Sequence, residues 1–160
     1  MKICVLLKQV PGKDVDIKIN DDGKSVNFDN VNMVINECDS YALEEALLIR
    51  ESLGGEVIVC SFGSESSNQI IKDALSKGAD RGILINNDTD YAPDILSISK
   101  FLKPILEKEK FDLILSGLQS DDMGNGQLGI LMAELLDMSH ASLVMETKIE
   151  SEKSIKVKRE

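Results

Sequence analysis

The sequence predicts an α/β protein built on a doubly wound parallel sheet. Four short apolar runs, at residues 2–8, 57–60, 83–85 and 113–115, alternate with longer segments whose apolar residues recur at helical spacing. The first run contains the unbroken apolar stretch from Ile3 to Leu7, which is typical of a strand covered on both faces. Strands that alternate with helices favour a parallel sheet between two helical layers. A chain of 160 residues fits one domain, so we expect a single α/β domain over residues 1–160.

The first predicted helix lies between the first and second strands. It begins near Asp39 or Ser40, because either side chain can accept a hydrogen bond from the open amides of a first turn. Gly54 and Gly55 end it.

Three further helices are predicted from the same periodicity, over about 67–77, over 94–108, and after Gly126, where the apolar stripe reaches Met138. Pro104 lies inside the 94–108 pattern and is expected to kink that helix or split it in two.

Two β-hairpins are predicted outside the alternating pattern. The segment from Gly12 to Ile35 is too long for a simple connection, and its apolar residues alternate around a turn at Asp22–Gly23. Near the end of the chain, residues 148–158 alternate around a polar Glu-Lys-Ser bend. We expect both segments to be hairpin insertions on the sheet domain.

Composition excludes several classes of partner. A formal net charge of −10 disfavours nucleic acid and anionic lipid, because the surface repels phosphate. Three cysteines without paired spacing, and an N-terminus without a targeting pattern, favour a reducing, cytoplasmic location. No apolar stretch approaches the length of a membrane span, so we expect the protein not to be integral to the membrane.

The sequence contains no recognisable combination of catalytic residues. His140 is the only histidine, and it follows a predicted helix without a nucleophile or carboxylate at matching spacing. Glu44 and Glu45 fall on the solvent side of a predicted helix. No lysine follows the glycines of residues 117–129, as a triphosphate-binding loop would require. We therefore expect no catalytic residues and no metal site.

The segment from Ser116 to Gly129 is the strongest candidate for a binding site. It follows a predicted strand, contains four glycines and leads into a predicted helix, whose first amides can hold a phosphate. In an open parallel sheet, ligands bind beyond the carboxyl ends of the strands, where the strand order reverses. Asp121 and Asp122 could accept hydrogen bonds from ribose hydroxyls. A simple exposed turn has a similar composition, so both interpretations stand at this point.

Ordered blocks along the chain resemble the beta subunits of electron transfer flavoproteins. They are Val5–Pro11, Asn36 with Asp39 and Ala42–Leu47, Gly54–Val57 leading to Ser61–Gly63, Ala74–Arg81, the loop residues Gly117, Gln119, Asp122, Gln127 and Gly129, and Val157–Glu160. The resemblance covers nearly the whole chain. It departs from the family pattern at Glu37, where a proline is usual, and at Leu128, where the usual residue is Thr or Val.

This resemblance implies an adenine nucleotide alpha hydrolase-like sheet that binds AMP or, in bifurcating members, FAD. It also implies an alpha subunit, an FAD at the interface with it, and electron donors such as the acyl-CoA dehydrogenases of fatty acid oxidation. The chain would then be an electron carrier subunit, not an enzyme. The implied cofactor-binding residues are Leu6, Lys8, Asn36, Asp39, Ser61, Phe62, Gly63, Gly117, Gln119, Asp122, Gly126, Gln127, Leu128 and Gly129.

Family members continue beyond the block that matches Val157–Glu160, through a recognition loop and a C-terminal arm. We therefore expect this chain to correspond to the N-terminal, nucleotide-binding part of a beta subunit, truncated relative to the family. Two other functions fit the predicted topology. One is a stand-alone adenine-nucleotide-binding module of the universal stress protein type, and the other is an enzyme acting on the nucleotide.

Overall fold

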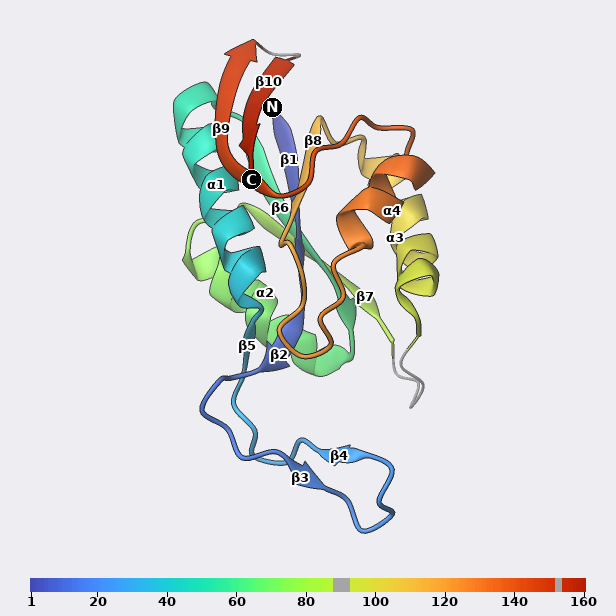
Figure 1. Ribbon diagram of the computed structural model, residues 1–160. Helices are drawn as coiled ribbons and strands as arrows, with labels where there is room; N and C mark the ends of the chain where they lie inside the picture. Colours follow the sequence, from blue (N-terminus) through green and yellow to red (C-terminus); the bar gives the residue numbers. More distant parts are fainter. Residues whose placement is uncertain (88–92, 152–153) are drawn as a thin grey trace.

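A four-stranded parallel sheet forms the centre of the molecule, as predicted (Figure 1). The computed structural model describes residues 1–87, 93–151 and 154–160. The strands lie in the order β7-β6-β1-β8, and every neighbouring pair is parallel. They comprise β1 (Lys2–Leu7), β6 (Glu56–Gly63), β7 (Arg81–Asn86) and β8 (Leu113–Ser116). The chain moves from β1 to β6 and β7 on one side and then returns to β8 on the other, so the order reverses between β1 and β8.

Helices cover both faces of this sheet (Figure 1). They are α1 (Glu37–Leu53), α2 (Asn68–Ser76, preceded by the 3₁₀ turn η1, Glu65–Ser67), α3 (Ile95–Glu109) and α4 (Leu128–Leu135). Successive side chains of a strand point to opposite faces. Accordingly, Ile3 of β1 packs with α1 and α2, whereas its neighbour Cys4 packs with α3 and α4. The unbroken apolar run of β1 is therefore buried on both sides.

The start of α1 differs from the prediction. The helix begins at Glu37 with Asn36 at the N-cap position, so Asp39 lies inside the first turn and does not cap it. Asp39 has a side chain suited to capping, but its carboxylate accepts hydrogen bonds from the backbone amides of Lys8 and Gly117, which follow β1 and β8.

The helices α3 and α4 also differ from their predicted forms. α3 continues through Pro104 without being split. Proline removes the donor for the carbonyl of Lys100, and Lys100 is exposed, so water can bind there. α4 ends at Leu135, before Met138, because Asp137 adopts a left-handed φ of 53° and the Met138 amide binds the Ala133 carbonyl at 2.9 Å.

The predicted insertion between β1 and α1 is a hairpin in two parts. At its base, β2 (Gln9–Pro11) pairs antiparallel with β5 (Met33–Ile35), and at its tip β3 (Lys18–Ile19) pairs with β4 (Val26–Asn27). The predicted turn is confirmed, since Gly23 has a φ of 67° and its amide binds the Asn20 carbonyl at 2.9 Å. The tip extends away from the sheet, beyond the carboxyl ends of its strands (Figure 1).

The second predicted hairpin closes the described chain. β9 (Val144–Ser151) and β10 (Ser154–Arg159) are antiparallel, and the predicted bend at Glu152 and Lys153 lies outside the described residues. Ile149 packs on the core cluster of α1 and α2, and the Thr147 hydroxyl donates to Glu45 of α1. This hairpin lies at the opposite end of the molecule from β3 and β4 (Figure 1).

Candidate functional site

The carboxylate of Asp39 joins the carboxyl ends of β1 and β8. One of its oxygens accepts a hydrogen bond from the Lys8 amide at 2.8 Å, and the other accepts one from the Gly117 amide at 3.0 Å. Lys8 directly follows β1, and Gly117 directly follows β8. The strand order reverses between these two strands, and parallel strands diverge at such a point, where α/β proteins bind ligands. A buried side chain of α1 therefore bridges the predicted site.

Asn36, the N-cap residue of α1, holds the loop that follows β8. Its side-chain nitrogen Nδ2 donates a hydrogen bond to the Gln119 carbonyl at 2.9 Å, and its side-chain oxygen Oδ1 accepts one from the Asp121 amide at 2.9 Å. The side chain is 1% exposed. Both hydrogen bonds are thus shielded from water, and they fix the path of residues 119–121 relative to α1.

Lys8 and Asp122 form an ion pair across the same loop, with 2.7 Å between Nζ and the carboxylate oxygen. This pair gives Asp122 a partner within the chain, beside the ribose contact that the sequence suggested. The structure thus brings together Lys8, Asn36, Asp39, Gly117, Gln119 and Asp122.

Two glycines of the loop are needed for close packing against the protein itself. A Cβ on Gly117 would lie 2.3 Å from a carboxylate oxygen of Asp39 and 2.7 Å from the backbone of Cys38. A Cβ on Gly129 would lie 2.7 Å from the Ser116 hydroxyl. The sequence suggested that these glycines admit a ligand to the backbone. The structure gives them a further reason, which is the approach of the loop to α1 and of α4 to β8.

The first turn of α4 adjoins this loop and has no side-chain cap. Gln127 occupies the N-cap position, but its side chain makes no capping hydrogen bond. The amides of Leu128, Gly129 and Ile130 precede the first residue that can reach an acceptor within the helix. Such amides, together with the helix dipole, favour an anion at this end of α4. Gly126 approaches the loop itself, since a Cβ there would lie 3.0 Å from the Leu118 carbonyl.

The remaining predicted residues lie on β1 and β6, and Leu6 pairs in register with Ser116 at the end of β8. Leu6 is buried in the core cluster of α3 and α4. Ser61 is also buried, and its hydroxyl has no hydrogen-bond partner among the described residues. Phe62 stacks on Phe101 of α3 with ring centroids 5.5 Å apart. Gly63 ends β6, one strand away from β1.

The electrostatic environment of Asp39 is unusual for an aspartate. Burial raises the pKa of its carboxyl to about 6, and the hydrogen bonds from the Lys8 and Gly117 amides offset this only in part. The position in the first turn of α1 also favours the ionised form, because the helix dipole is positive there.

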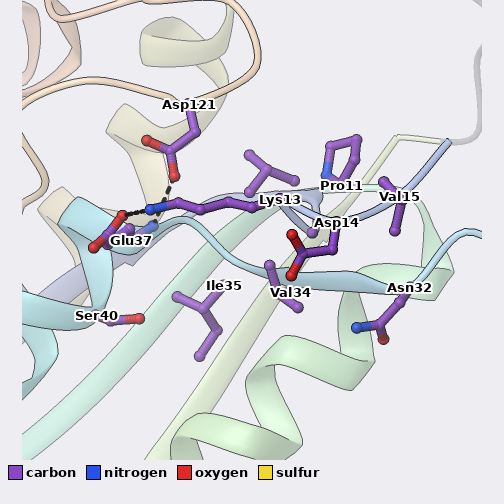
Figure 2. A pocket seen from close by; sticks show the side chains of 12 residues that line it. Pro11, Lys13, Asp14, Val15, Asn32, Val34, Ile35, Glu37, Ser40 and Asp121 are labelled. Carbon is purple, nitrogen blue, oxygen red and sulfur yellow. Dashed lines mark hydrogen bonds and ion pairs between the residues drawn. The ribbon is translucent and has the colours of Figure 1, made fainter. Parts of the chain in front are cut away.

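A cavity of about 530 Å³ lies between the start of α1 and the base of the inserted hairpin (Figure 2). Lys13 extends across it to pair with Glu37, and Asp121 accepts a hydrogen bond from the Glu37 amide at 3.1 Å (Figure 2). Sequence reasoning missed this cavity, and no predicted cofactor-binding residue lines it. Glu37, which stands where the family pattern has a proline, is one of the residues that line it.

Two further properties of the described chain bear on its class. Among the described residues, no group of three or more His, Cys, Asp or Glu side chains is placed to hold a metal ion. The described helices include none that is both long and apolar enough to cross a membrane.

The fold and this strand-end site define a doubly wound α/β domain of the kind that binds ligands at a switch point. Residues 25–160 match the family model described as electron transfer flavoprotein domain. The chain belongs to that family, as the sequence blocks predicted.

Three similar proteins are each named electron transfer flavoprotein subunit beta. The chain is 37% identical to that of Bradyrhizobium diazoefficiens over 163 residues, which cover 100% of this chain and 64% of the relative. It is 34% identical to that of Methylophilus methylotrophus, with 91% of this chain and 56% of the relative covered. For Dictyostelium discoideum the identity is 35%, with 100% and 63% covered. The chain thus spans about three fifths of the length of these relatives.

Proposed function

We propose that this chain is the nucleotide-binding part of an electron transfer flavoprotein beta subunit. It binds an adenine nucleotide, either AMP or a second FAD, at the rim between β1 and β8. It pairs with an alpha subunit, and the two share the FAD through which electrons pass from dehydrogenases, such as those acting on acyl-CoA. The chain itself acts as a carrier component and contributes no catalytic residues.

The anchored loop is the observation that carries this proposal. Asn36 and Asp39 tie the loop to α1, and the loop ends at the uncapped first turn of α4. A fixed loop costs little further conformational entropy when a ligand binds. The phosphate of the nucleotide would accept hydrogen bonds from the amides of residues 126–129.

Ser61 gives separate support for a ligand with hydroxyl or amine groups at the strand ends. A buried hydroxyl without a partner costs free energy, and a ligand that reaches the carboxyl end of β6 could satisfy it. We assign Leu6, Ser61, Phe62 and Gly63 to the wall of the site beside the loop.

Identification of the bound molecule tests this function. The chain is co-expressed with the alpha subunit of its own organism, the complex is purified and denatured, and the released molecules are identified by mass. We expect one AMP or FAD from this chain, besides the FAD shared with the alpha subunit. A colourless homodimer that carries ATP would instead favour the stress-protein type of module, and turnover of the nucleotide would favour an enzyme.

A further inference from the structure

Phe62 and Phe101 form a stacked aromatic pair at the carboxyl end of the sheet. Their ring centroids are 5.5 Å apart, and their planes are inclined by 23°. Phe62 is the last residue but one of β6, and Phe101 lies near the middle of α3. The chain contains four phenylalanines and no tryptophan, and two of the four meet here. An aromatic surface is thus built at this edge in a protein that is otherwise poor in aromatic side chains.

This pair lies on the same face of the sheet as the start of α4. Phe62 and Leu128, the first residue of α4, both pack on the core cluster that contains Leu6. The amide of Leu128 is among those that we assign to the phosphate of the nucleotide. The aromatic pair and the phosphate-binding amides therefore share one apolar cluster, on the side of the sheet that α3 and α4 cover.

The strand register brings Phe62 level with the rim between β1 and β8. Leu7 of β1 pairs in register with Ser61 of β6. The next residues along the two strands are Lys8 and Phe62, so these two come at the same level. Lys8 is part of the rim, because its amide donates to the Asp39 carboxylate. The ring of Phe62 is thus one strand away from the joint that holds the loop after β8.

Both rings of the pair retain area that the described chain does not cover. Phe101 is 54% exposed, and Phe62 is only partly buried. Aromatic side chains favour offset stacking, and every nucleic-acid base presents a π-face that stacks on such a ring. Phe62 and Phe101 therefore supply the chemistry that binds a base, at a place separate from the amides that suit a phosphate.

We propose that the purine of the nucleotide stacks on the Phe62 ring, and that Phe101 is a positioning residue that holds this ring in the required orientation. This assignment rests on the proposed function, because it takes the nucleotide at the rim as the ligand. Phe101 thereby adds α3 to a site formed otherwise by β1, β6, the start of α1 and the loop that leads into α4. Phe62 touches the base, whereas Phe101 acts through Phe62.

Two ligands that differ only in the base test the role of Phe101. The complex with the alpha subunit is depleted of nucleotide and titrated with AMP, and ribose 5-phosphate is measured by its competition with AMP. Phe101→Ala should weaken the affinity for AMP by about tenfold or more, as expected for a lost stacking contact. The affinity for ribose 5-phosphate should stay unchanged. Phe101→Tyr keeps an aromatic ring and should keep the affinity for AMP.

A matched control and a double variant complete the experiment. Leu96→Ala removes another exposed apolar side chain of α3, and it should leave the affinity for AMP unchanged. Because Phe101 acts through Phe62, the two losses should not add: Phe62→Leu alone and Phe62→Leu with Phe101→Ala should bind AMP about equally weakly. Thermal unfolding checks that each variant folds, and we expect little change for Phe101→Ala because its side chain is exposed.

The outcomes separate the role of Phe101 from the proposed function. If the wild-type complex binds AMP and Phe101→Ala binds it equally well, Phe101 does not position the base site, while the proposed function stands. An equal loss of affinity for AMP and for ribose 5-phosphate would show a general structural effect and would also overturn the assignment. If the wild-type complex binds neither AMP nor FAD, the proposed function fails, and the assignment of Phe101 fails with it.

Discussion

Asp39 and Gly117 lie 78 residues apart in the sequence, yet the Gly117 amide donates a 3.0 Å hydrogen bond to the Asp39 carboxylate. The same carboxylate accepts a hydrogen bond from the Lys8 amide. One side chain thus ties together the first turn of α1, the end of β1 and the start of the loop after β8.

Removal of the Asp39 carboxylate should destabilise the protein. Asp39→Ala leaves the amides of Lys8 and Gly117 without their acceptor, which costs about 1 to 3 kcal/mol in the free energy of unfolding. Urea titration measures this loss, and hydrogen exchange at the two amides reports it locally. Glu44→Ala is the matched control, because Glu44 is an exposed acid of the same helix. Equal stability of the two variants would contradict the structural role of Asp39.

The raised pKa of Asp39 predicts a pH dependence of stability. An aspartate in the unfolded chain has a pKa of about 3.9, whereas that of folded Asp39 is about 6. Between these values the folded state binds more protons, so stability contributed by this group falls as the pH rises from about 4 to about 6. The full effect is about 3 kcal/mol. In Asp39→Asn the titrating group is absent, so the difference in stability between wild type and variant should change over this window. A constant difference would show that the pKa is not raised.

Gly117 should tolerate no side chain. In Gly117→Ala the new methyl group would meet Asp39 and the backbone of Cys38, so either the loop or α1 must move, at a cost of about 1 to 3 kcal/mol. Gly124→Ala is an informative comparison, because no atom lies within 4 Å of a Cβ there. Its positive φ alone should cost about 1 kcal/mol. Denaturant unfolding compares the two, and a smaller loss for Gly117→Ala would contradict the packing argument.

Asn36 should contribute to the affinity of the protein for its nucleotide. Asn36→Ala removes both hydrogen bonds to the loop. The loop is then ordered only when the nucleotide binds, and this ordering lowers the net free energy of binding. We expect the affinity for AMP or FAD to fall by about tenfold, for a cost near 1.4 kcal/mol. Calorimetric titration of the nucleotide-depleted complex measures it. Asn68→Ala, at the start of α2, serves as the control. Unchanged affinity in Asn36→Ala would place the ligand away from the anchored loop.

Much of the fold could be predicted because its signals are local. The apolar run from Ile3 to Leu7 specifies a doubly covered strand, and Asp22–Gly23 specifies the hairpin turn. The helix ends were less predictable. Asp39 has a good capping side chain, but a tertiary contact with two strand ends competes for it, and no local pattern reports such a contact.

The candidate site was predictable as a set of residues more than as a geometry. The resemblance named Lys8, Asn36, Asp39 and Gly117 together, and the structure places them in contact. It did not indicate the pairing of Lys8 with Asp122, because that pair depends on how two distant loops fold. Nor did the resemblance indicate the cavity beside Lys13 and Glu37, because that cavity depends on how the base of the hairpin lies against the start of α1.

The hydrogen bonds that hold this rim together also determine when the rim can form during synthesis. The side-chain hydrogen bonds of Asn36 join residues 83 and 85 positions apart, so this side chain lacks both partners until the residues after β8 have left the ribosome. Contacts of such long range close late, because the entropy of loop closure must be overcome first. The rim is thus assembled after the β1–β6–β7 part of the sheet, and a nascent chain that stalls before Gly117 lacks the loop that would satisfy the side chains of Asn36 and Asp39.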